Sequence, residues 1–170
     1  MFALTVWAAR FHFASAAMPL KLVVVSILAT ADVAVFVHAL WRHPRGPLLL
    51  GAALTLFVAS AALCLWAIAA SRSAALKLAF DSHSPRSILE TGPYRYIRHP
   101  FYSAYIVFWT GCAVATLHPV NVALLPILAG AFLVAALGEE RAFDRSPEAA
   151  AYAAYRRRAG MLWPKLVRRR

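Results

Sequence analysis

The densest group of chemically active side chains lies between residues 92 and 102. This stretch reads Gly-Pro-Tyr-Arg-Tyr-Ile-Arg-His-Pro-Phe-Tyr and contains two arginines, one histidine and three tyrosines. A long apolar segment follows, and Pro100 suits the first turn of its helix. The unpaired N–H groups at that helix start would then lie beside Arg98 and His99, which predicts a site for a carboxylate or phosphate. A basic and aromatic belt at a membrane surface explains the residue types equally well.

Two glutamates, Glu139 and Glu140, end the next apolar segment. The turn between the two segments falls near residue 118, and about 20 residues separate it from Arg98 on one side and from Glu140 on the other. Helical arms of equal length return the glutamates to the level of Arg98 and His99. Because adjacent helical residues point in different directions, we expect one glutamate to face the site and the other to meet solvent or an arginine.

The composition identifies the elements that must position these groups. The chain is 62% hydrophobic and 15% charged, and a soluble domain would carry roughly 25% charged residues. Four apolar stretches, at 20–40, 48–70, 101–117 and 120–138, approach the ~20 residues of a membrane-spanning helix. We therefore predict an all-α integral membrane protein with about four transmembrane helices, the last two forming a C-terminal helical hairpin.

The chain is expected to form a single membrane domain over residues 1–170. Residues 1–90 hold the first two spans and a loop, and residues 91–164 hold the motif, the hairpin and an amphipathic tail. In that tail, Ser146-Pro147-Glu148 predicts the start of a short helix that has Pro147 in its first turn and ends near Arg158.

The distribution of basic residues predicts the orientation. Of the 18 Lys and Arg, 16 lie in the N-terminal segment, the middle loop and the tail, and only Arg42 and Arg45 lie on the other side. The positive-inside rule places both termini in the cytoplasm, as in an inner or plasma membrane protein. The net charge of +11 then reflects topology and contact with membrane lipids, and no nucleic-acid partner is expected.

The spans themselves contain few polar residues. Asp32 and His38 lie in the first predicted span, and we interpret Asp32 as paired with a Thr, Tyr or Lys of a neighbouring helix. Cys64 and Cys112 lie in apolar runs, far from any Cys or His at metal-ligand spacing. Neither a disulfide nor a metal site is expected.

The ordered motifs resemble those of the isoprenylcysteine carboxyl methyltransferase family and its relatives, the membrane phospholipid N-methyltransferases. In that group, a Gly-Pro-Tyr-x-x-x-Arg-His-Pro-x-Tyr-x-Gly segment precedes a helical hairpin, a Glu-Glu pair and a Tyr-x-x-Tyr-basic tail that ends near a Pro. Two departures stand out: Ala104 replaces the last Gly of the first motif, and the Phe-Gly normally found before the tyrosine pair is replaced around Ser146. The matching residues are 92–94, 98–102, 139–140, 152–158 and Pro164.

The resemblance implies S-adenosylmethionine as the cofactor, bound at the cytoplasmic end of the hairpin, and an amphiphilic, lipid-like or prenylated acceptor. Carboxyl O-methylation is the expected reaction and phospholipid N-methylation the alternative. The cofactor's carboxylate needs a cation or a helix start, its ammonium needs a carboxylate, and its sulfonium favours aromatic faces. The expected cofactor-binding residues are Tyr94, Tyr96, His99, Pro100, Tyr102, Glu140 and Tyr155, and the expected catalytic residues are Arg98 and Glu139.

Two other functions remain open. A membrane reductase that uses NADPH would need more basic residues for the extra phosphates, and Arg86 and Arg95 are available, although the short chain argues against it. A non-enzymatic membrane scaffold explains the spans and charges, but gives no reason for glutamates opposite the Arg-His-Pro-Tyr cluster. The soluble methyltransferase plan is excluded because the chain contains no Gly-x-Gly turn.

Overall fold

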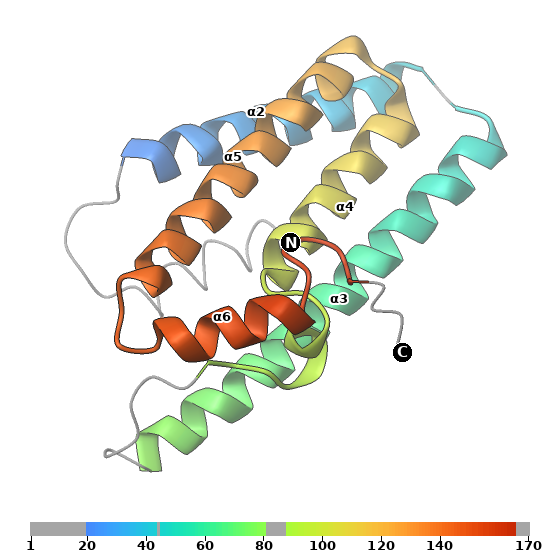
Figure 1. The fold of residues 1–170 in the computed structure, drawn as a ribbon. Coiled ribbons are helices and arrows are strands. Elements are labelled where there is room, and N and C mark those ends of the chain that lie inside the picture. The colour runs from blue at the N-terminus through green and yellow to red at the C-terminus, as the bar shows by residue number, and fades with distance from the viewer. Residues whose placement is uncertain (1–19, 44, 81–87, 166–170) are drawn as a thin grey trace.

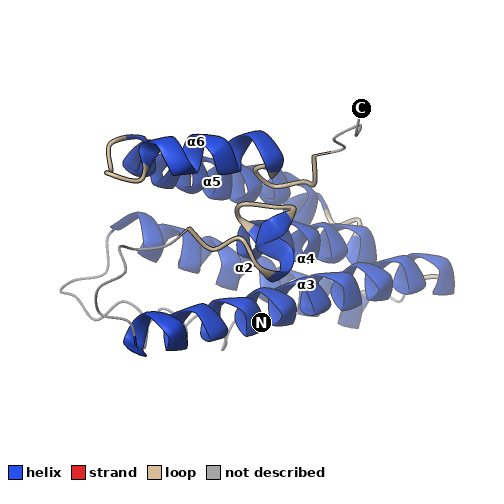
Figure 2. Cartoon of the chain, turned by 60° about the horizontal axis from the view of Figure 1, so that its bottom comes forward, coloured by secondary structure: helices blue, strands red, loops and turns tan. Residues whose placement is uncertain are grey.

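The computed structural model describes residues 20–43, 45–80 and 88–165, and the regular elements within this part of the chain are all helical (Figure 2). The predicted all-α fold is therefore confirmed. Arg86, which the NADPH alternative uses, lies outside the described residues. Four long helices pack along a bundle and a shorter one crosses its end (Figure 1). They are α2 (Leu20–Arg42), α3 (Pro47–Phe80), α4 (Pro100–Thr116), α5 (Pro119–Asp144) and α6 (Ala149–Arg158), with a 3-10 turn, η1 (Gly92–Arg95), before α4.

Within the described residues, three helices are long and apolar enough to cross a membrane. The segments concerned are Val23–Arg42, Pro47–Arg72 and Pro119–Asp144. The third predicted span corresponds to α4, which has 17 residues and a length of about 26 Å, against the ~30 Å of a hydrocarbon core. Nine residues of α4 are buried, so this helix lies inside the bundle. The integral membrane character is supported, and the count of four spans stays a prediction.

Small residues allow α4 to approach α3 closely. Ala104 is fully buried, and its carbonyl oxygen accepts a hydrogen bond of 2.7 Å from the Ser60 hydroxyl of α3. A Cβ atom at Gly111 would lie 2.6 Å from the ring of Phe57. Such small residues are typical of helix contacts in membranes. Ala104, which departs from the resembled motif, thus contacts α3.

The buried Asp32 of α2 is paired across the bundle, as interpreted, but with an amide partner. Asn121 of α5 donates to the Asp32 carboxylate at 2.8 Å and to the Asp32 carbonyl oxygen at 3.0 Å. Thr116 in turn donates to the Asn121 side chain at 3.1 Å. All three residues are at most 1% exposed. A buried polar group of this kind needs such partners, and the Asn121 amide supplies them for Asp32.

The tail helix begins two residues later than predicted. α6 starts at Ala149, with Glu148 at its N-cap. The Ser146 hydroxyl donates to the carbonyl oxygen of Phe143 at 2.8 Å and accepts the Glu148 amide at 3.3 Å, so Ser146 belongs to the turn between α5 and α6. The helix ends at Arg158, as predicted. Its chain then turns back across the start of α4 (Figure 1).

Candidate active site

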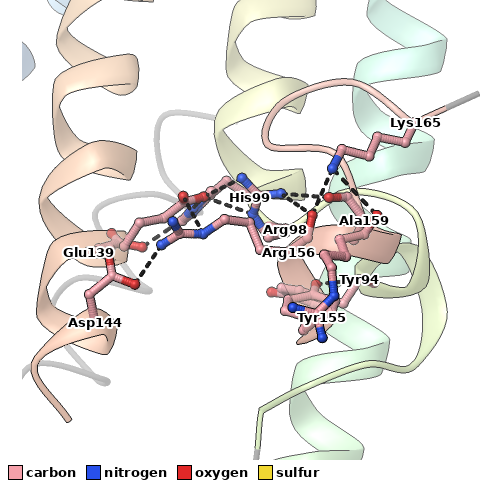
Figure 3. A network of polar contacts seen from close by, with 11 residues as sticks. Tyr94, Arg98, His99, Glu139, Asp144, Tyr155, Arg156, Ala159 and Lys165 are labelled. Carbon is pink, nitrogen blue, oxygen red and sulfur yellow. Dashed lines mark hydrogen bonds and ion pairs between the residues drawn. The ribbon is translucent and has the colours of Figure 1, made fainter. Parts of the chain in front are cut away.

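Figure 3 shows the network of polar contacts around Arg98, His99 and Arg156. A buried ion pair between Arg98 and Glu140 lies at the centre of this candidate site. The Nε and Nη2 atoms of Arg98 lie 2.8 and 2.7 Å from Glu140 Oε1, and the two side chains are 6% and 7% exposed. His99 Nε2 lies 3.3 Å from the same oxygen. Arg98 Nη1 also donates to the carbonyl oxygen of Ala159 at 2.5 Å. The prediction that equal hairpin arms bring the glutamates level with Arg98 and His99 is confirmed.

The second glutamate is half-exposed and also contacts His99. Glu139 Oε2 lies 3.3 Å from His99 Nδ1, its side chain is 51% exposed, and its other oxygen accepts the Tyr102 hydroxyl. The Tyr102 ring stacks on the His99 ring at a centroid distance of 5.6 Å. Both glutamates therefore reach His99, which corrects the expectation that only one would face the site. An imidazolium would donate to both carboxylates, whereas a neutral imidazole can donate to one.

Arg156 of α6 completes the cluster, and the sequence-based site did not include it. Its Nη2 atom lies 2.7 Å from Asp144, and its guanidinium lies 5.5 Å from the ring centre of Tyr152. Its Nε lies 3.5 Å from Glu140 Oε2 and has no hydrogen-bond partner although it is buried. The feature of the sequence that could have identified Arg156 is its position directly after Tyr155 in the basic tail.

Backbone hydrogen bonds fasten the tail to the segment that carries Arg98 and His99. The Arg98 amide donates to the Gly160 carbonyl at 2.8 Å, and the His99 amide donates to the Met161 carbonyl at 3.1 Å. The Gly160 amide donates to the Tyr96 carbonyl at 3.0 Å, forming a short parallel bridge. The tail thus fixes the backbone that presents Arg98 and His99.

The other residues predicted to bind the cofactor are found in different environments. Pro100 is buried at the first position of α4, as predicted. The Tyr155 hydroxyl donates to the Tyr94 carbonyl at 2.6 Å. The Tyr96 ring is instead half-exposed and lies 6.4 Å from the ring of Trp66 on α3. Burial raises the pKa of Tyr94 to about 12 and raises that of Tyr155 above its usual range, so both phenols stay neutral.

The apolar helices define an integral membrane protein, and a cluster of charged side chains lies at the end of one hairpin. A family model described as phospholipid methyltransferase matches residues 48–146, and the chain belongs to that family. The match contains Arg98, His99 and both glutamates, whereas α6 lies beyond it. Neither the curated proteins nor the solved structures give a match. The family resemblance is thus confirmed, and it implies a methyltransferase with lipid substrates in a membrane.

Proposed function

We propose that the protein transfers a methyl group from S-adenosylmethionine to an amphiphilic acceptor. The observation that carries the proposal is the loose pair between Arg156 Nε and Glu140 Oε2, 3.5 Å apart, in which the buried Nε lacks a hydrogen bond. The amino-acid end of the cofactor is a zwitterion. Its carboxylate fits Arg156 and its ammonium fits Glu140, because charged partners form the strongest hydrogen bonds.

The neighbouring rings suit the reacting end of that cofactor. When bound, it supplies a methyl group on a positively charged sulfur, and stacked aromatic rings stabilise a nearby cation. The His99 and Tyr102 rings are stacked beside both glutamates. Methyl transfer depends mainly on alignment of the donor and acceptor, so positioning by these residues supplies most of the catalysis.

We favour an amine acceptor, as in a phospholipid headgroup. Glu139 is the exposed carboxylate of the cluster; it holds an ammonium headgroup and accepts the proton that the amine must lose. The guanidinium of Arg98 is 6% exposed and is occupied by Glu140 and Ala159, so it is poorly placed to grip an acceptor carboxylate. Carboxyl O-methylation is the second candidate, supported by Arg156, whose side chain is 38% exposed. The expected catalytic role of Arg98 stays a prediction.

A binding titration tests the proposal directly. Calorimetry of the purified protein in detergent micelles should give saturable binding of S-adenosylmethionine, with micromolar affinity as an order-of-magnitude expectation. Labelled methyl groups should then appear in phosphatidylethanolamine rather than in a prenylated cysteine. Saturable heat with NADPH and none with S-adenosylmethionine would instead establish the reductase alternative.

Tyr102→Phe should lower turnover about tenfold, because it removes one hydrogen bond to the charged Glu139 and keeps the stacked ring. The affinity for S-adenosylmethionine should change less. Methyl-transfer rates of Tyr102→Phe, Glu139→Gln and the double variant form the test. If Tyr102 acts through Glu139, the double variant is no slower than Glu139→Gln; additive losses exclude this coupling.

Membrane labelling tests the predicted orientation. Single cysteines at Ser84 and Ser146, on a background without Cys64 and Cys112, should react with an impermeant reagent from the cytoplasm only. The motivation is that 16 of the 18 basic residues lie on this side. A cysteine at His43, beyond the opposite end of α2, is the control and should react only from outside. Labelling of either test position from outside contradicts the arrangement.

A further inference from the structure

A cavity on the tail side of the bundle lies apart from the cluster that holds Glu139 and Glu140. Its volume is about 390 Å³, which falls within the ~300–1,000 Å³ of small-molecule sites. Tyr155 forms part of its wall and lies on the other side of the polar network from Glu139 and Asp144 (Figure 3). The cavity therefore has the size of a ligand site, and neither Glu139 nor Glu140 lines it. The described residues that line it are Glu90, Arg95, Tyr155 and Arg158.

The charges around this cavity favour an anion. Two arginines and one glutamate line it, and Arg158 Nη2 lies 2.9 Å from Glu90 Oε2. The two side chains of this pair are 65% and 40% exposed, so the pair is weak and an incoming anion can replace Glu90. Arg95 is exposed and lies 5.9 Å from the ring centre of Tyr96. Two arginines that line the same cavity suit phosphate, because a guanidinium can bind two of its oxygens.

We propose that this cavity binds the phosphate of a phosphoester, supplied by an anionic phospholipid headgroup or by a soluble compound. The volume exceeds that of a bare phosphate ion and leaves room for a glycerol-like ester. The Tyr96 ring lies against Trp66 of the apolar helix α3, and such aromatic pairs are typical of the headgroup level of a membrane. Basic pockets beside membrane helices bind anionic headgroups. The inference does not rest on methyl transfer.

The test uses the full chain in neutral detergent micelles. Short-chain dihexanoyl phosphatidic acid is titrated and followed by native mass spectrometry, with glycerol 3-phosphate as the soluble competitor. Arg95→Gln and Arg158→Gln should each weaken lipid binding about tenfold or more, because each removes charge-assisted hydrogen bonds. The matched control is Arg157→Gln, which removes the same charge from the tail but does not line the cavity; its affinity should stay within about twofold.

The competitor separates the two sources of phosphate. Displacement of the lipid by glycerol 3-phosphate supports recognition of the phosphate itself, and binding of the lipid without displacement supports recognition of a whole lipid. Failure of wild type to bind either probe overturns the proposal, as do equal losses in all three variants. Affinity for S-adenosylmethionine should be unchanged in the variants, and circular dichroism should show an unchanged helical fold. If wild type binds no S-adenosylmethionine, the proposed function fails while the phosphate titration still decides the cavity.

Discussion

Glu140→Gln should destabilise the protein by about 3–5 kcal/mol, the cost of breaking a buried ion pair from one side. Glutamine keeps the size of the side chain but removes the charge that balances Arg98 in a site where both side chains are less than 10% exposed. His99 and Arg156 lose the same partner. The affinity for S-adenosylmethionine should also fall about ten- to a hundredfold, because the cofactor's ammonium loses a charged hydrogen-bond acceptor.

The adjacent Glu139→Gln is a matched control. It makes the same chemical change at a side chain that is 51% exposed, so the free energy of unfolding should fall by less than about 1 kcal/mol while turnover decreases. Denaturant titration in detergent micelles measures the free energy of unfolding of both single variants, and a methyl-transfer assay measures their turnover. Adding Arg98→Gln to Glu140→Gln should restore part of the lost stability, because no buried charge is then left unpaired. Equal free energies of unfolding for the two single variants would show that the buried Arg98–Glu140 pair does not stabilise the fold.

Gly160→Ala should release the tail from the segment that carries Arg98 and His99. A Cβ atom at this position would lie 1.8 Å from the carbonyl oxygen of Trp163 and 3.1 Å from the amide nitrogen of Lys165. Backbone atoms cannot yield as a flexible side chain can, so the turn must move. Three backbone hydrogen bonds depend on it, and we expect a loss of about 3 kcal/mol at roughly 1 kcal/mol each, with loss of methyl transfer.

Hydrogen exchange locates this effect. The amides of Arg98 and His99 donate to the tail, so both should lose protection in Gly160→Ala while α4 beyond them stays protected. Gly138→Ala is the control, since a Cβ atom there meets nothing within 4 Å. It should leave exchange and activity as in wild type. Unchanged protection of Arg98 and His99 in Gly160→Ala would mean that the tail pairing does not position them.

The sequence by itself determined the positions of the helices. It also determined that the end of α5 returns to the start of α4. Runs of apolar residues specify membrane-compatible helices, because only a helix satisfies its own backbone hydrogen bonds in lipid. A helix rises by a fixed ~1.5 Å per residue, so counting residues along two arms was enough to place both glutamates opposite Arg98 and His99.

The tertiary structure alone decided which glutamate is buried and what fastens the tail. The rotation of α5 against α4 buries Glu140 and leaves Glu139 half-exposed, and that rotation depends on side-chain packing over the whole interface. Arg156 and the carbonyl of Ala159 reach the site through the turn after α5 and the pairing of Gly160 with Tyr96. The pairing of Gly160 with Tyr96 joins backbone groups about 60 residues apart, and backbone groups carry no sequence pattern from which such pairing can be predicted.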